Sequence, residues 1–144
     1  MMSRVRWVLD TDVIVAGLRS PSGASAAILK AADAGMIQLL VTVTLALEYE
    51  AQCTAPQHRD AAKLTLHEAG NFVNAIIRIA EPVAPHFLWR PQLRDPGDEM
   101  VLEAAINGKA DAIVTFNLRD YGTVPAQFGI EIFPPAHAIR RVRQ

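Results

Sequence analysis

Oxygen-bearing side chains directly follow several short apolar segments of this 144-residue chain. Asp10 and Asp12 come after the run 5–9, and Asn117 comes after the run 112–116. Carboxylate and amide oxygens with no accompanying His or Cys suit a hard divalent cation, Mg²⁺ or Mn²⁺, better than zinc. Such an ion activates water and neutralises charge at a phosphodiester. These residue types therefore favour metal-assisted hydrolysis of a phosphate ester.

A further carboxylate lies at the start of an expected helix. Pro96 and Gly97 interrupt the chain, and Asp98 then opens an apolar helix as an N-cap or first-turn residue. The apolar residues three, four and seven positions after Asp98 share one helical face, so Asp98 begins the stripe that faces the core. Burying a charged carboxylate there costs free energy unless a positive charge lies nearby. The helix dipole would offset this cost weakly, and a bound cation would offset it strongly. An ordinary helix cap is the alternative interpretation.

Strands that alternate with helices predict an α/β fold. We expect a three-layer α/β/α sandwich with a mostly parallel central sheet, in a single domain over residues 1–144. Buried strands are predicted at 5–9, 37–43, 112–116 and 130–133, and helices at 24–34, 57–66, 68–79, 98–107 and 135–142. Thr44 is expected to cap the helix after the second strand. The joint of the helical hairpin is expected near residues 67–70.

In open parallel sheets, ligands bind outside the carboxyl ends of the strands. Five side chains should point toward that edge: Asp10, Asp12, Glu48, Asp98 and Asn117. Each of these residues could instead have an ordinary structural role, because Asp commonly caps helices, Glu is commonly exposed to solvent and Asn commonly forms turns. The support comes from their joint occurrence at matching strand ends.

Four segments together resemble a known family. They are Val8–Asp12, Glu48, Arg94–Glu99 and Ala112–Tyr121. They look like the PIN-domain family and, more narrowly, the VapC-like ribonucleases that are toxin components of bacterial toxin–antitoxin pairs. The resemblance extends from Val5 to about Pro134. Its most specific part is the Asp-Pro-Gly-Asp-Glu helix start, followed later by Ile-Val-Thr-Phe-Asn-Leu-Arg-Asp.

The resemblance implies a metal-dependent endoribonuclease with one or two Mg²⁺ or Mn²⁺ ions at the sheet edge. The matching catalytic and metal-binding positions are Asp10, Glu48, Asp98 and Asn117. Accessory positions are Asp12, Thr115, Asp95 and Asp120. Asn117 departs from the family pattern, since it keeps an oxygen but loses a charge, and a second metal should bind more weakly there. The resemblance also implies a cognate antitoxin protein as a partner.

Other features bear on substrate and partners. Arg94 and Arg119 flank the acidic motifs and are candidates for contacts with RNA phosphates, as is Arg90. Trp89 is a candidate for stacking on a base, with packing as the alternative. The apolar hairpin at 56–79 is expected to form a homodimer or to receive an antitoxin helix.

The composition limits which classes of protein this chain can belong to. The net charge of −1 gives no support to nucleic-acid binding by itself. A single cysteine, Cys53, favours an inert thiol in a cytoplasmic protein. No apolar segment is long enough to cross a bilayer, and the first residues do not form a signal peptide.

Two other functions remain open at this point. Val8–Asp12 also resembles the nucleophile motif of haloacid-dehalogenase-like phosphatases, in which Asp10 would be phosphorylated. Alternatively, the chain is a non-catalytic PIN-like domain that binds RNA or a protein. Titration with metal in the presence of RNA would separate binding from cleavage.

Overall fold

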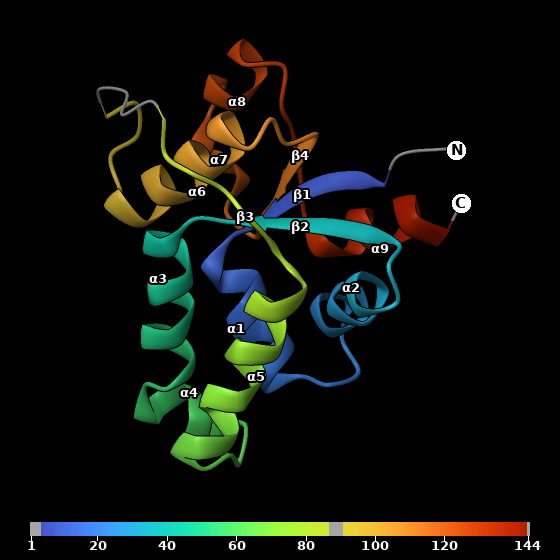
Figure 1. The fold of residues 1–144 in the computed structure, drawn as a ribbon, viewed down its shortest axis with the longest axis vertical. Helices are drawn as coiled ribbons and strands as arrows, with labels where there is room; N and C mark the ends of the chain where they lie inside the picture. Colours follow the sequence, from blue (N-terminus) through green and yellow to red (C-terminus); the bar gives the residue numbers. More distant parts are fainter. Residues whose placement is uncertain (1–3, 87–90, 144) are drawn as a thin grey trace.

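A computed structural model describes residues 4–86 and 91–143. Within them, five parallel strands form one sheet in the order β3-β2-β1-β4-β5 (Figure 1). The strands are β1 (Val5–Leu9), β2 (Ile37–Val41), β3 (Glu81–Pro82), β4 (Ala112–Val114) and β5 (Glu131–Phe133). The predicted α/β class is confirmed, and every strand pair in this part of the chain is parallel.

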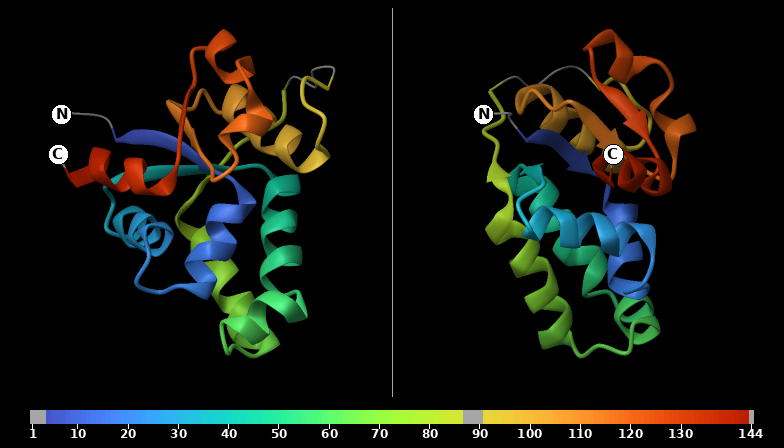
Figure 2. Two further views of the ribbon diagram at one scale, coloured as in Figure 1. Left: turned by 180° about the vertical axis from the view of Figure 1, so that it is seen from behind. Right: turned by 90° about the vertical axis from the view of Figure 1, so that its right-hand side faces the viewer.

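Helices cover both faces of the sheet. They are α1 (Thr11–Arg19), α2 (Ala24–Asp33), α3 (Val43–Cys53), α4 (Pro56–Ala61), α5 (Leu66–Ile79), α6 (Pro96–Asn107), α7 (Leu118–Tyr121), α8 (Val124–Gln127) and α9 (Pro135–Arg143). In Figures 1 and 2, α1, α2, α3 and α5 lie on one side of β1 and β2, and α6, α7 and α8 lie on the other. This arrangement is the expected three-layer sandwich.

The central strands are apolar because both of their faces are covered. Val8 and Leu9 of β1 and all three residues of β4 are buried. Near-continuous apolar runs are typical of strands in parallel sheets with helices on both faces. The core therefore lies along β1 and β4, the two strands that lead into the acidic residues.

The register of the sheet places the acidic residues side by side. Leu9, the last residue of β1, pairs with Val114, the last residue of β4. The Asp10 amide then donates to the Val114 carbonyl at 2.9 Å. Asp10 and Thr115 therefore leave the sheet at the same level, although 105 positions separate them in the sequence.

Helices α3 and α6 begin two residues before their predicted starts, although Asp98 does lie in the first turn of its helix, one of the two positions predicted for it. Thr42, rather than Thr44, caps α3, and its hydroxyl accepts from the Leu45 amide at 3.2 Å, because β2 already ends at Val41. Asp95, rather than Asp98, caps α6, which leaves Asp98 in the first turn.

The joint of the helical hairpin was also misplaced. Thr65 and Glu68 form a capping box at the start of α5, so the joint precedes residues 67–70 and lies at 62–65. The two-residue strand β3 and the helix α8 were not predicted. The sequence also predicts an irregular or extended segment at 86–91, of which residues 87–90 lie outside the described residues. In the described part of the chain, no helix combines the length and apolarity needed to span a bilayer.

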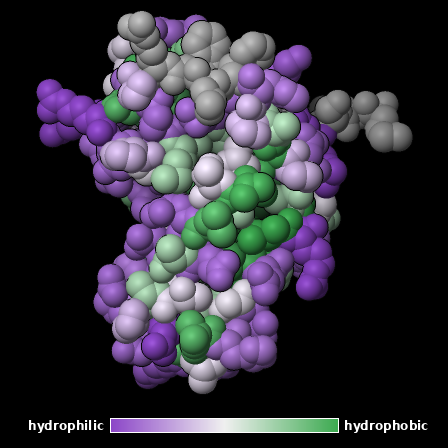
Figure 3. All heavy atoms as spheres, turned by 60° about the vertical axis from the view of Figure 1, so that its left-hand side comes forward, coloured by the Kyte–Doolittle hydropathy of each residue, from purple (hydrophilic) through white to green (hydrophobic). Residues whose placement is uncertain are grey.

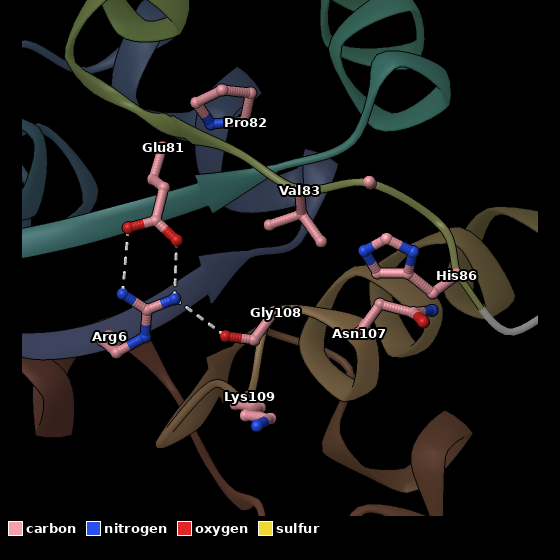
Figure 4. A pocket seen from close by; sticks show the side chains of 9 residues that line it. Arg6, Glu81, Pro82, Val83, His86, Asn107, Gly108 and Lys109 are labelled. Atoms are coloured by element: carbon pink, nitrogen blue, oxygen red, sulfur yellow. Dashed lines mark hydrogen bonds and ion pairs between the residues drawn. The ribbon is translucent and has the colours of Figure 1, made fainter.

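An arginine joins three elements on the side of the sheet near β3. Arg6 on β1 donates to both carboxylate oxygens of Glu81 on β3, at 3.0 and 2.7 Å, and to the Gly108 carbonyl at 2.9 Å (Figure 4). These bonds lie beside a cavity of about 430 Å³. Gly108 follows the last residue of α6, so this cavity lies at the opposite end of α6 from Asp98.

Candidate functional site

A cavity of about 320 Å³ opens at the carboxyl end of β1. Five carboxylates line it: Asp10, Asp12, Glu48, Asp95 and Asp98. They come from the end of β1, the start of α1, the middle of α3 and the start of α6. The fold thus brings side chains from distant parts of the sequence to one hollow, with Gln52 and His58 also in its wall.

Asp10 is buried, and two hydroxyl groups hold one of its oxygens. Oδ2 accepts from the Thr115 hydroxyl at 2.7 Å and from the Tyr121 hydroxyl at 2.9 Å. Thr115 Oγ1 in turn accepts from the Asn117 amide at 3.0 Å, which orients its proton toward Asp10. Both donors engage Oδ2, so Oδ1 is the oxygen left for a ligand.

Asp12 has one satisfied oxygen and one orphaned oxygen. Oδ2 accepts from the Phe116 amide at 3.2 Å and from Asn117 Nδ2 at 3.0 Å. Oδ1 is buried and has no hydrogen-bond partner in the described part of the chain. Burial, followed by the negative charge of Asp10, raises the pKa of Asp12 to about 7. The hydrogen bonds that Asp12 accepts therefore compensate its charged form only in part.

Asp98 is buried in the first turn of α6, where the helix start fixes its position. Asp95 Oδ1 accepts from the Gly97 amide at 2.7 Å and from the Asp98 amide at 3.4 Å. Burial raises the pKa of Asp98 to about 6, helped by the charges of the neighbouring carboxylates Asp10, Asp95 and Asp120. The nearby Tyr121 hydroxyl favours the charged form of Asp98 and acts in the opposite direction.

Glu48 reaches the cavity from α3, on the side opposite α6. It is half-buried, and its Oε1 accepts from Gln52 Nε2, one helical turn later, at 3.2 Å. His58 on α4 stands near this pair, with Nδ1 3.4 Å from Arg19 Nη1. Helix α3 therefore contributes one carboxylate to the cavity, that of Glu48, and the side-chain amide of Gln52 holds it in place.

Asn117 lies at the edge of this arrangement. It is exposed, and it does not belong to the described lining of the cavity. Its amide nitrogen donates to Asp12, and its backbone amide donates to Thr115. The contacts that the structure shows for Asn117 therefore hold two other members of the site.

A second cavity, of about 610 Å³, adjoins the first and shares Asp95 and Asp98 with it. Arg94, Arg119 and Asp120 also line it. Neither arginine forms an ion pair or a side-chain hydrogen bond with another described residue. Arg94 and Arg119 thus lie beside the carboxylates with no anionic partner among the described residues. Trp89 and Arg90 lie outside the described residues.

The donor set can be tested against a divalent cation. Among the described residues, no three His, Cys, Asp or Glu side chains already converge as a finished metal site. The chemistry nevertheless fits, because the carboxylates around the cavity supply only oxygen ligands. Among the described residues the buried Asp12 Oδ1 has no hydrogen-bond partner, and burial, followed by repulsion from neighbouring carboxylates, raises the pKa values of Asp12 and Asp98. A cation between these groups would supply the missing compensation.

Sequence reasoning missed Tyr121. Burial and then the charge of Asp10 raise the pKa of Tyr121 far above its usual range, so its hydroxyl remains a donor. One signal was available, because the hydroxyl of a buried tyrosine generally requires a partner. Gln52 and His58 gave no such signal.

Comparison with known proteins identifies the family. A family model described as a PIN domain matches residues 6–119, most of the chain and the segment from β1 to the start of α7. A search of curated proteins found no match. PIN domains are generally nucleases and typically use a divalent metal. With this match and a parallel sheet that carries acidic residues at its carboxyl edge, the chain belongs to the PIN-domain family.

Proposed function

We propose that this protein is a metal-dependent endoribonuclease that hydrolyses RNA phosphodiester bonds. The observation that carries the proposal is the single cavity lined by Asp10, Glu48 and Asp98, beside the orphaned Oδ1 of Asp12. A bound Mg²⁺ or Mn²⁺ ion would lower the pKa of a water molecule and offset the negative charge that develops on phosphorus. No side chain needs to act as the nucleophile.

The proposed roles follow the contacts of each residue. Asp10, Glu48, Asp98 and Asn117 form the proposed catalytic and metal-binding set, with Asp12, Thr115, Asp95 and Asp120 as accessory residues. Thr115 orients Asp10, and Asp95 orients Asp98 through the helix start. Since Asp12 has the orphaned oxygen and Asn117 turns its amide nitrogen toward it, Asp12 is the stronger candidate of these two for a ligand.

The adjoining cavity supports a role for arginines in binding RNA. Arg94 and Arg119 lie beside Asp98 without a described anionic partner. Guanidinium groups bind phosphate through paired hydrogen bonds. Glu99 accepts from the Leu93 amide at 2.9 Å and so holds the cavity wall that carries Arg94. The strand of RNA is proposed to cross from the acidic cavity into this basic one.

The biological setting is proposed from the resemblance to VapC-like toxins. In this proposal the protein acts in the cytoplasm, forms a homodimer and is restrained by a cognate antitoxin. Val43 and Leu47, one turn apart on α3, are 75% and 60% exposed, and such apolar surface supports a protein partner. Figure 3, which brings the left-hand side of Figure 1 forward, shows apolar residues gathered across the middle of one face.

The enzymatic proposal is tested with purified protein and an end-labelled single-stranded RNA. Cleavage is expected with Mg²⁺ or Mn²⁺ and not with EDTA, and the Asp98→Asn variant should lose it while remaining folded by circular dichroism. Asp33→Asn, at an exposed position at the end of α2, is the matched control. Equal cleavage by the wild-type protein and Asp98→Asn would contradict the assignment of Asp98.

A non-catalytic PIN-like domain is the second candidate. It is favoured by the absence, among the described residues, of three side chains already converged as a metal site. Saturable RNA binding without cleavage, across a titration with Mg²⁺ and Mn²⁺, would support it. The family match gives no support to the haloacid-dehalogenase-like alternative.

A further inference from the structure

Tyr121 is a buried polar residue at the centre of the acidic site. It closes the short helix α7, and its side chain is completely inaccessible to solvent. Gly122 follows it with a φ of 54°, a positive value that glycine adopts without strain. The ring is therefore anchored in the core, and the hydroxyl group is directed at the carboxylates.

The hydroxyl of Tyr121 contacts Asp10 and influences Asp98. It donates to Asp10 Oδ2 at 2.9 Å, the same oxygen that Thr115 engages. Asp98 lies close enough for its negative charge to help raise the pKa of Tyr121. One hydroxyl thus stands between a carboxylate at the end of β1 and a carboxylate in the first turn of α6.

Two donors on one oxygen have a geometric consequence. With Oδ2 held by the hydroxyl groups of Thr115, directly after β4, and of Tyr121 in α7, the Asp10 carboxylate cannot rotate without breaking two hydrogen bonds. The orientation that remains leaves Oδ1 for a cation. Partners of this kind orient metal ligands, and their removal typically lowers metal affinity by about 10- to 100-fold.

We propose that Tyr121 is a positioning residue of the metal site, which fixes the orientation of the Asp10 carboxylate. The inference rests on the proposed metal-dependent function. It adds a residue from α7 whose hydroxyl acts through Asp10 and does not touch the reacting atoms.

The test is Tyr121→Phe, which removes the hydroxyl and keeps the ring. Calorimetric titration of the RNA-free protein with Mn²⁺ should give a dissociation constant about 10- to 100-fold above that of the wild-type protein. In cleavage assays, the concentration of Mn²⁺ needed for half-maximal rate should rise by a similar factor. The KM for RNA at saturating Mn²⁺ should stay unchanged, which a general loss of structure would not produce.

The chain offers a matched control in Tyr49. Tyr49 is also buried, and its hydroxyl donates to the Leu9 carbonyl, the residue before Asp10, instead of to a carboxylate. Tyr49→Phe should leave the affinity for Mn²⁺ unchanged. Thr115→Val removes the other donor to Asp10 Oδ2 and should lower that affinity as Tyr121→Phe does.

The outcomes separate this inference from the function on which it rests. If the wild-type protein binds Mn²⁺ and cleaves RNA while Tyr121→Phe binds Mn²⁺ equally well, the positioning role is overturned and the nuclease stands. An equal loss of affinity in Tyr49→Phe and Tyr121→Phe would also overturn it. If the wild-type protein does not bind Mn²⁺, the metal-dependent function and the positioning role both fail.

Discussion

Burial disfavours the charged forms of the carboxyl groups of Asp12 and Asp98. The pKa values of about 7 and about 6 both lie above the ordinary value of 3.8. A raised pKa means that the folded state holds its proton more tightly than the unfolded state does. Its contribution to stability is complete below the unfolded pKa and is lost as the pH rises through the folded pKa. The metal-free fold should therefore lose stability between about pH 4 and pH 7.

The first prediction concerns this loss of stability at higher pH. In EDTA, the wild-type protein should melt at a lower temperature at pH 7.5 than at pH 5, and Asp98→Asn should reduce the difference because it removes one titrating group. Thermal melts followed by circular dichroism at both pH values measure it, with Asp33→Asn as the exposed control. The same pH difference in Asp98→Asn and the wild-type protein would show that Asp98 does not titrate in this range.

The second prediction concerns ligand addition. At pH 7.5, Mn²⁺ should raise the melting temperature of the wild-type protein, because an ion that binds only the folded state stabilises it. The increase should be smaller in Asp98→Asn and in Asp10→Asn. Differential scanning fluorimetry across a titration with Mn²⁺ gives the comparison. An increase that is the same in all three proteins would indicate binding elsewhere.

At the scale of elements, the strands were predictable and the helix starts were less so. Apolar runs in the sequence predicted β1, β2, β4 and β5, because strands that are buried on both faces are apolar along their length. β3 has two residues and contains a proline, so it gave no pattern. The start of α5 had a readable signal, since Thr65 and Glu68 have the spacing of a capping box.

The acidic site was predictable only in part. Strand ends and helix starts showed which carboxylates reach the edge of the sheet. Thr115 and Tyr121 both donate to one oxygen of Asp10, although they lie 105 and 111 positions after it in the sequence. Local sequence patterns do not encode such tertiary contacts. The same holds for the orphaned oxygen of Asp12, because burial of a single atom depends on all the elements around it.

The third prediction belongs to helix α6. Asp95→Ala removes the N-cap and should lower the free energy of unfolding by about 1 kcal/mol. It should also weaken binding of Mn²⁺, because the first turn that it holds carries Asp98. Thr65→Ala removes the cap of α5 and should have a similar effect on stability with no effect on Mn²⁺. Chemical denaturation and calorimetry measure the two effects, and equal Mn²⁺ affinities would contradict the role of the α6 cap.

At the scale of the whole molecule, α6 joins the acidic cavity to the side of the sheet near β3. A Cβ at Gly108 would lie 2.9 Å from the Ala104 carbonyl oxygen, 2.9 Å from Val83 Cγ2 and 3.0 Å from Leu40 Cδ1. The backbone of α6, the segment after β3 and β2 therefore meet too closely there for a side chain. The end of α6 is fixed by this close approach.

The fourth prediction uses that contact. Gly108→Ala should destabilise the fold by about 1–3 kcal/mol through overpacking. Gly70→Ala is the matched control, because Gly70 lies inside α5 with nothing within 4 Å of its added Cβ. That variant should be more stable than the wild-type protein, by up to about 1 kcal/mol. Urea denaturation distinguishes the opposite signs, and equal effects would contradict the packing described for Gly108.

We propose that carboxylates from the end of β1 and from α1, α3 and α6 surround a divalent cation. The most direct measurement is an anomalous difference map from a crystal of this protein grown with Mn²⁺. We predict a single strong peak in the cavity, within coordination distance of Asp10 and Asp98. A map at saturating Mn²⁺ with no peak in this cavity, or with peaks only at other sites, would contradict the account.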